Sequence, residues 1–452
     1  MERNNVVNTD GSIDWDKIGS FDTQLAEKAR IISIEKFGGV GDGITDNTNA
    51  LLSAISYAKT NKSTIFIPNG IFVVLSAQKV LIDFDVFQLK GNGKYNSKIS
   101  FKNATGGFLY KKPVTTSWIY KPTFDDIAII GTNLCNTLVT FENTISEMNI
   151  TNCYFGESLV SIFKFTNMSG VYIDNSDIVN APIGFEVDIV GILNISGLNI
   201  FNVRKVFSIT TSIVYMRVNG STYIEKCDIF LHGKSTFVGI GHFVMTDCNM
   251  LHNNGTQSPF TFESLDFITK FIIRDCYLNI QTICGSIFNL IPVRVVGIAF
   301  ITIKDSVIQR GAIGQLTNLI NVASGSSSNS TRLLIDNSML PPIMDEDFII
   351  GNRGILSIVS TEFNYAVNNG IRLSLIDSYA GRLYYNNIND FPYIKNKSDI
   401  GRKFMLYETG TTVNRPTTDL FYGRQYFDWD LGIPIYVNKY STGWINAMGT
   451  VV

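Results

Sequence analysis

A short motif recurs along the middle of the chain. It runs apolar, any residue, Asn or Asp, Cys or Ser, any residue, apolar, and copies occupy residues 150–155, 173–178, 224–229, 245–250, 273–278, 303–308 and 335–340, with a degenerate copy at 195–200. A repeat of a few tens of residues is typical of a solenoid, in which each repeat forms one coil. Each step holds three short strands, so the sequence predicts stacked parallel coils with loops at 230–243, 251–270 and 279–300.

Stacking places equivalent motif positions in a column along the axis. The predicted column contains Cys153, Cys227, Cys248 and Cys276, and serines take the same position in other copies. Because small half-polar side chains suit tight turns, we predict buried free thiols rather than a redox or metal site. The six cysteines lack the paired spacing of a zinc site, and no cofactor is predicted.

A glycine-rich turn, a helix and a strand precede the repeat. Gly41 and Gly43 flank a sharp bend, and Thr45 or Asp46 is predicted to cap the helix. Its predicted apolar face consists of Ala50, Leu51, Ala54, Ile55 and Ala58. A strand at 65–67 then ends in a turn at 68–70. The Gly-Lys-Ser/Thr ending of a phosphate-binding loop is absent, so this turn is predicted to be structural.

The order of these segments resembles the N-terminal cap of pectate-lyase-like right-handed β-helix proteins, a superfamily that includes phage tailspikes and polysaccharide-degrading enzymes. Residues 19–29 resemble the leader that joins phage appendages to the virion, and residues 415–449 resemble a small β module at the ends of phage tail proteins. The resemblance implies an all-β right-handed parallel β-helix with this domain plan: leader 1–30, cap 31–75, β-helix 76–382 and C-terminal β module 383–452. It also implies a homotrimer in the virion, attached to other tail proteins through the leader.

Charge and hydropathy exclude several other classes. Only 17% of residues are charged, the net charge is -2, and lysines and arginines are scattered, which argues against nucleic-acid binding. Residues 1–11 are polar and lack the apolar region of a secretory signal. The most apolar stretch, 287–303, is interrupted by Pro292 and Arg294, and it predicts two buried strands rather than membrane insertion.

Candidate catalytic residues come from the acidic side chains of the coils that are predicted to carry the loops. Glycoside hydrolysis needs two carboxylates across the sugar bond, and neighbouring coils can supply them. The predicted catalytic residues are Glu225, Asp228, Glu263 and Asp266, the last two in an aromatic setting of Phe260, Phe262 and Phe267. Asp247 and Asp275 are placed on the coils that follow Glu225 and Asp228.

Substrate-binding residues are predicted in the same region. They are His252, Arg274 and Tyr277. His232 is predicted to stack with His252 on adjacent coils, while His242 lies on another face. Arg274, Tyr277 and Lys304 keep a lyase mechanism open, in which a basic group removes a proton beside a uronate.

Three functions remain open from the sequence. The first is a tailspike that binds and hydrolyses a bacterial cell-surface polysaccharide. The second is a non-enzymatic structural or receptor-binding appendage, and the third is a polysaccharide lyase.

Overall fold

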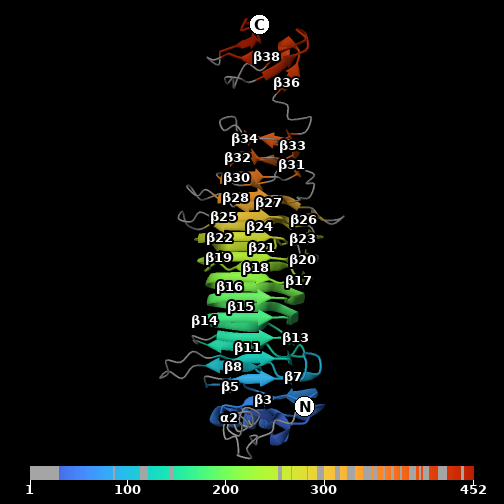
Figure 1. The fold of residues 1–452 in the computed structure, drawn as a ribbon, viewed down its shortest axis with the longest axis vertical. Helices are drawn as coiled ribbons and strands as arrows, with labels where there is room; N and C mark the ends of the chain where they lie inside the picture. The colour runs from blue at the N-terminus through green and yellow to red at the C-terminus, as the bar shows by residue number, and fades with distance from the viewer. Residues whose placement is uncertain are drawn as a thin grey trace, which may run out of the picture.

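The chain winds into a tall stack of parallel coils, with a helix at one end and a separate small sheet at the other (Figure 1). The computed structural model describes residues 30–452 except 85–86, 112–120, 143–146, 253–256, 266, 282–283, 293–299, 311–315, 323–330, 339–348, 351–353, 360–361, 368–370, 377–378, 386–392, 396–398, 401–406, 416–424 and 439–441. The predicted leader therefore lies outside the described residues, except for Arg30. The predicted all-β parallel β-helix is confirmed.

Each coil passes through three parallel sheets, here called sheets 1, 2 and 3 in the order in which the chain passes through them from β4 onwards. Sheet 1 contains β4 (Gly70–Val74), β7 (Ser97–Phe101), β10 (Ala128–Ile130), β13 (Tyr154–Gly156), β17 (Thr222–Glu225), β20 (Cys248–His252), β23 (Tyr277–Ile280) and β26 (Val307–Arg310), with β2 (Asp42–Asp46) paired to β4. Sheet 2 contains β5 (Val80–Ile82), β8 (Phe108–Lys111), β11 (Thr137–Glu142), β18 (Ile229–Gly233), β21 (Phe260–Leu265), β24 (Cys284–Pro292), β27 (Leu316–Val322) and β29 (Ile349–Ile350).

Sheet 3 forms the third side of each coil. It contains β1 (Ile31–Ser33), β3 (Thr64–Phe66), β6 (Gln88–Lys90), β9 (Thr123–Asp125), β12 (Glu147–Thr151), β19 (Gly239–Thr246), β22 (Phe267–Arg274), β25 (Phe300–Lys304), β28 (Thr331–Asp336), β30 (Gly354–Val359), β32 (Ile371–Ile376) and β34 (Tyr393–Lys395). In the middle of the stack the strands bend from one sheet into the next without a break. These long strands are β14 (Ser161–Asp174), β15 (Asp177–Ser196) and β16 (Asn199–Asn219).

Stacked aromatic rings fill the interior of the helix. Phe163, Phe185 and Phe207 occupy one register position on successive coils, with ring centroids 5.2 and 4.9 Å apart and planes within 12° of parallel. All three are fully buried. Burying each ring contributes about 1.5–3 kcal/mol, so this column is a principal source of the stability that holds coil on coil.

A tight corner joins sheet 3 to sheet 1 on most coils. One residue of each turn has a left-handed backbone with φ between 44° and 58°, and these residues are Asp126, Asn152, Asn175, Gly197, Asp247, Asp275, Asp305 and Asn337. The amide of Asp247 donates to the carbonyl of Arg274 on the next coil at 3.2 Å, and the other turns repeat this bond. Asn, Asp and Gly adopt this conformation most readily, which explains the Asn/Asp position of the motif.

The Cys/Ser position forms the predicted column with one correction. Thr222, not Cys227, pairs with Cys248. An extra turn residue, Ser221, takes the true copy of this coil out of the motif pattern, and Cys227 lies beyond the end of β17. The hydroxyls in this column accept hydrogen bonds from backbone amides of the preceding coil. Ser306 Oγ, for example, accepts one from Cys276 N at 3.2 Å. The column is therefore structural. The five cysteines whose side chains the structure describes are all buried and free, as expected.

The three wide loops predicted at 230–243, 251–270 and 279–300 are wrong as loops. Most of these residues form strands of sheets 2 and 3, from β18 to β24. The motif marks only the corner and sheet 1, so it carries no signal for the two further strands that lie between two copies. The pair of buried strands predicted around 287–303 is confirmed by β24 and β25.

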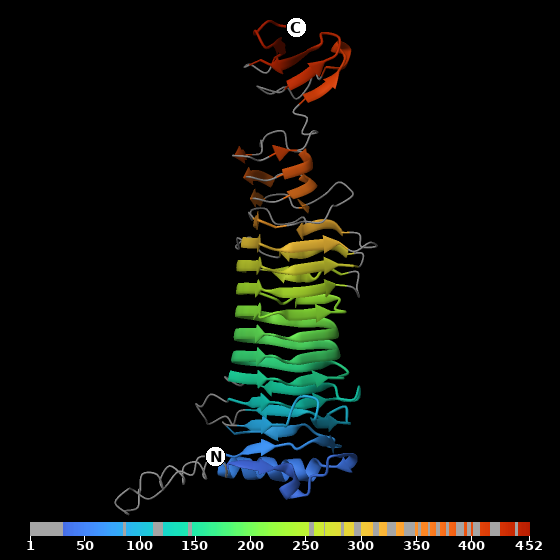
Figure 2. The same cartoon turned by 45° about the vertical axis from the view of Figure 1, so that its right-hand side comes forward.

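The helix α2 (Thr48–Asn61) lies across the N-terminal end of the stack (Figure 2). Its five predicted apolar residues are all buried. Asn47 is the residue before the helix, but its side chain bonds to both backbone groups of Val40 at 2.6 and 3.0 Å and not to the helix. The predicted Asp46 supplies the side-chain oxygen, because its Oδ1 accepts a hydrogen bond from the amide of Thr48 at 2.9 Å. Among the described residues, no helix has the length and apolar character needed to span a membrane.

Before α2, the chain turns through η1 (Ile34–Phe37) and the glycine-rich segment. Gly43 has the expected positive φ of 78°, whereas the φ of Gly41 lies outside the left-handed range. Gly41 is needed for another reason, because a side chain there would meet the Phe72 ring at 3.0 Å and the Gly70 backbone at 3.2 Å.

Parallel pairing continues beyond the predicted domain boundary at 382. A three-stranded sheet of β31 (Glu362–Val367), β33 (Tyr379–Tyr385) and β35 (Asp399–Ile400) extends the coils to residue 400. The last sheet then contains β36 (Tyr407–Gly410), β37 (Gln425–Asp428), β38 (Ile433–Val437) and β39 (Trp444–Asn446), with η2 (Thr412–Asn414) beside it. Its buried core consists of Tyr426, Ile435, Val437 and Trp444.

Candidate functional site: an acidic groove at a corner of the β-helix

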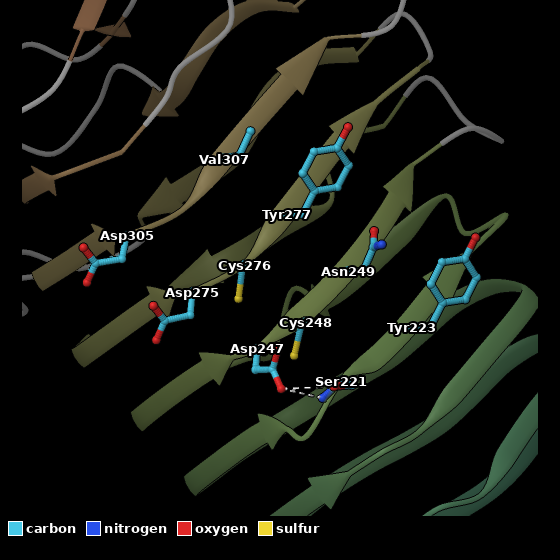
Figure 3. A pocket seen from close by; sticks show the side chains of 10 residues that line it. All are labelled: Ser221, Tyr223, Asp247, Cys248, Asn249, Asp275, Cys276, Tyr277, Asp305 and Val307. Atoms are coloured by element: carbon cyan, nitrogen blue, oxygen red, sulfur yellow. Dashed lines mark hydrogen bonds between the residues drawn. The ribbon is translucent and has the colours of Figure 1, made fainter.

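A groove of about 600 Å³ opens at the corner between sheets 3 and 1 (Figure 3). It is lined by Ser221, Tyr223, Asp247, Cys248, Asn249, Asp275, Cys276, Tyr277, Asp305 and Val307. These residues come from four successive coils, so the groove runs along the helix axis. The only charged side chains in its lining are three carboxylates.

The carboxylates of Asp247, Asp275 and Asp305 form one row in Figure 3. They occupy the left-handed corner position on neighbouring coils, so each step along the row is about 4.8 Å. The Oδ2 of Asp247 accepts hydrogen bonds from Ser221 N and Oγ, both at 3.1 Å. Three stacked negative charges cannot donate hydrogen bonds to one another, and they repel.

Elsewhere the same corner row is held by amide side chains. Asn152 Nδ2 donates to Asp126, and Asn175 Nδ2 donates to Asn152 Oδ1 at 3.4 Å. Asn337 Nδ2 likewise donates to Asp305 Oδ1 at 2.6 Å. The groove is thus the segment of the row in which aspartates take the place of asparagines on three consecutive coils. This replacement weakens the stacking of the coils, because carboxylates repel one another where amides would form hydrogen bonds.

A second row, parallel to the carboxylates, presents two phenol rings and an amide. Tyr223, Asn249 and Tyr277 pair in register on the outer face of sheet 1 (Figure 3). Burial and a 3.0 Å hydrogen bond to Glu225 raise the pKa of Tyr223. The hydroxyl of Tyr277 bonds to Gln309. Aromatic faces beside carboxylates and amides are a suitable surface for sugar rings.

The structure brings two of the three predicted substrate-binding residues to this groove. Tyr277 lines it, and Arg274 stands at its rim, with Nε 3.2 Å from Asp275 Oδ2. Lys304 pairs in register with Arg274 but binds Asp336, at 3.1 Å. The basic groups at this corner are therefore already paired with carboxylates.

Two predicted catalytic residues lie elsewhere on the coil. Glu225 is at the far end of β17, beyond Tyr223, and Asp228 follows the next corner, where its Oδ2 lies 3.1 Å from Arg204 Nε. Asp247 and Asp275 lie on the two coils that follow, as predicted. They are at the other end of the strands from Glu225, however, and four or more extended residues separate the two ends.

Glu263 lies on the outer face of sheet 2. Its aromatic neighbours in sequence, Phe260 and Phe262, point into the core, so the predicted aromatic setting is wrong for this side chain. Glu263 Oε1 instead lies 2.8 Å from His232 Nε2. Asp266 lies outside the described residues, and so does the side chain of Phe267.

The predicted stacking of His232 on His252 is also wrong, since His232, His242 and His252 lie on sheets 2, 3 and 1. His252 is fully buried, with Nδ1 3.1 Å from Cys227 O and Nε2 2.9 Å from Gln257 O. Burial lowers the pKa of His252 to about 4. This residue is thus a core group and not a substrate contact. No described group of three His, Cys, Asp or Glu side chains is arranged to hold a metal ion.

The sequence prediction includes Tyr277 but misses most of the other residues that build this groove. Asp247 and Asp275 are predicted on successive coils but not as catalytic residues, and Asp305, Tyr223 and Asn249 are not among the predicted site residues. The signal was present in the repeat itself, where the Asn/Asp position reads Asp in three consecutive copies.

The family of the chain follows from comparison of its sequence. The profile described as rhamnogalacturonase A/epimerase, pectate lyase-like, matches residues 31–276, which is more than half of the chain. The protein therefore belongs to this pectate-lyase-like family.

Several solved structures are similar to the chain at low sequence identity and with low TM-scores. Tailspike protein 3 of bacteriophage CBA120 is 14% identical, with 98% of this chain and 71% of that chain covered and a TM-score of 0.35. ORF18 of Geobacillus virus E2 is 17% identical, with 75% and 64% covered and a TM-score of 0.38. The catalytic domain of a GH87 α-1,3-glucanase in complex with nigerose is 11% identical, with 79% and 68% covered and a TM-score of 0.48. These likenesses concern the fold alone.

One curated sequence also matches over a short stretch. A non-secreted LysM effector of Penicillium expansum is 38% identical over 52 residues. The match covers 12% of this chain and spans only 4% of the length of that protein.

Proposed function

We propose that the protein is a phage tailspike that binds a bacterial cell-surface polysaccharide in the corner groove and hydrolyses it there. The observation that carries the proposal is the row of Asp247, Asp275 and Asp305 beside the row of Tyr223 and Tyr277. The carboxylate row supplies groups for acid and base catalysis, and the tyrosine row supplies faces for sugar rings.

The spacing of the coils sets the carboxylate separations. Neighbouring aspartates are about 4.8 Å apart along the axis, near the ~5 Å of retaining glycosidases, and the first and third are about 9.6 Å apart, near the upper limit for inverting enzymes. Asp247 and Asp275 are the proposed retaining pair. Asp247 receives two hydrogen bonds from Ser221, which hold its carboxylate in place and so suit the role of nucleophile.

The phage context rests on the resemblance of the first and last segments to phage leader and tail modules. It implies a virion location, attachment to other tail proteins through the leader, and a homotrimer. No nucleic acid, membrane or cofactor enters the proposed activity.

The groove favours hydrolysis over a lyase reaction. A lyase substrate carries a uronate carboxylate, which three aspartates would repel. Arg274, the group that would neutralise a uronate, is paired with Asp275.

Receptor binding without cleavage is the second candidate. Its support is that each aspartate also has a structural partner and a backbone conformation that suits Asp. Incubating the protein with surface polysaccharides from a panel of hosts separates the two, because hydrolysis creates new reducing ends. Retention of a polysaccharide without new reducing ends would leave the attachment role and remove the hydrolase.

A further inference from the structure

Tyr95 presents an exposed aromatic ring that is held rigidly in place. It lies in the turn between β6 and β7, and its side chain is well outside the core, with the residue 61% exposed. Its hydroxyl nevertheless donates a 2.6 Å hydrogen bond to Asp177 Oδ2. Its ring packs edge-on against Tyr154, with centroids 6.2 Å apart.

The group that anchors Tyr95 is itself buried and paired. Asp177 is 5% exposed, and its Oδ2 lies 3.1 Å from Lys94 Nζ. The same ammonium lies 5.5 Å from the centre of the Tyr95 ring. The bond to Asp177 is the largest of the effects that raise the pKa of Tyr95 to about 12, so the phenol stays protonated and keeps donating. A ring fixed in this way loses little conformational entropy when a ligand stacks on it.

This cluster lies in the same outer row of sheet 1 as the groove. Strand pairing aligns Tyr154 with Asp177, Asp177 with Asn199, and Asn199 with Tyr223. Tyr154 is therefore three coils from Tyr223, or about 14 Å along the axis. The side chain of Asn199, between them, is exposed and offers an amide to a ligand on this path.

We propose that Tyr95 and Tyr154 form a second sugar-binding subsite, and that one glycan chain lying parallel to the helix axis occupies this subsite and the corner groove together. This inference rests on the proposed function of the groove. Its ligand is the uncharged pyranose face of a polysaccharide segment long enough to bridge about 14 Å. The alternative role for Tyr95 is purely structural, in which its hydroxyl pins the turn to Asp177.

The test uses the full chain and two variants of one residue. Tyr95→Ala removes both ring and hydroxyl, whereas Tyr95→Phe removes only the bond to Asp177. The probe is the surface polysaccharide that the wild-type protein retains from a panel of bacterial hosts, cut by mild acid and sorted by length. Affinity for each length is measured by calorimetry, and a thermal melt of each variant reports folding.

A stacking subsite predicts a specific pattern. Wild-type affinity rises once the fragments span both subsites; Tyr95→Ala lowers affinity for long fragments roughly tenfold and leaves short ones unchanged. Tyr95→Phe binds as the wild type does, because it keeps the ring. If Tyr95→Ala binds long fragments as tightly as the wild type does, the inference is overturned. It is also overturned if both variants lose the same affinity, because the hydroxyl and not the ring would then be responsible.

The same experiment distinguishes the inference from the function on which it rests. Cleavage or binding in the groove without any dependence on fragment length removes the second subsite alone. A wild-type protein that retains no polysaccharide from the panel removes the proposed function and the subsite together.

Discussion

Two outer surfaces of the β-helix arrange their charged side chains in opposite ways. At the corner groove, three carboxylates stack on successive coils with a single guanidinium at the rim. On sheet 2, by contrast, positive and negative groups alternate and meet. Lys164 and Lys234 both approach Glu186, at 3.8 and 3.5 Å. Charge that is neutralised within the fold serves stability, whereas charge left in excess along a groove is available for a ligand.

On sheet 2, His232 lies between two charged side chains, those of Lys205 and Glu263, and these three residues are called the sheet 2 network. The His232 side chain is 5% exposed, with Nδ1 3.2 Å from Lys205 Nζ and Nε2 2.8 Å from Glu263 Oε1. A lysine ammonium can only donate, so Nδ1 accepts and the proton is on Nε2, which donates to Glu263. Burial lowers the pKa of His232 and also that of Lys205. The imidazole thus serves as a neutral bridge between a cation and an anion.

The comparison predicts its largest effect on catalysis. Asp275→Asn should reduce the release of reducing ends by about 10²–10⁴-fold, because it removes one of the proposed catalytic carboxyl groups without changing shape. Glu263→Gln, on sheet 2, should stay near wild type. The matched control is Asp126→Asn, at the same left-handed corner position outside the groove. The reverse ranking of Asp275→Asn and Glu263→Gln would move the active site to sheet 2.

On sheet 2 we expect a substitution to change the stability of the fold rather than its activity. His232→Phe keeps a ring of similar size but leaves Lys205 without its acceptor, so we expect a loss of about 1–3 kcal/mol in the free energy of unfolding. Urea titration measures it, and the polysaccharide activity should be unchanged. Unchanged stability together with lost activity would show that the network has a catalytic role.

Acid should weaken the folded protein partly through this histidine. The pKa of His232 is lower in the folded chain than the ~6.5 of the unfolded one, so the unfolded chain binds the proton first. Stability is therefore complete above about pH 6.5 and falls as the pH drops towards the folded-state pKa. Urea midpoints between about pH 7.5 and 4.5 should decline less in His232→Phe. His252, with a pKa of about 4, keeps part of the decline in both proteins.

The smallest expected effect concerns one hydroxyl beneath the network. Ser208 pairs in register with both Glu186 and His232, and its buried Oγ has no hydrogen-bond partner among the described residues. Ser208→Ala should be neutral or stabilising by up to about 1 kcal/mol. Ser161→Ala is the matched contrast, because its buried Oγ lies 3.0 Å from Thr137 Oγ1, and it should lose about 1 kcal/mol. A destabilised Ser208→Ala would mean that this hydroxyl is bonded in solution.

Much of the fold could be predicted because its signals are local. The motif identified the corner, since an Asn or Asp beside a small residue favours a left-handed turn wherever it occurs. The five apolar residues of α2 followed from helical spacing alone. The same reasoning failed at Cys227, where one inserted residue, Ser221, moved the true repeat copy out of the pattern.

The sequence by itself determined that the chain forms stacked β-coils with an N-terminal helix, buried thiols and apolar columns, because those depend on side-chain type and short periods. Only the tertiary structure decided which side chains meet. Contacts between coils join residues more than twenty positions apart, as in the bond from Cys153 to Ser176, and turn lengths set the register. Strand alternation then put Glu263 outside while its aromatic neighbours went inside, and it put three aspartates in one row beside two tyrosines.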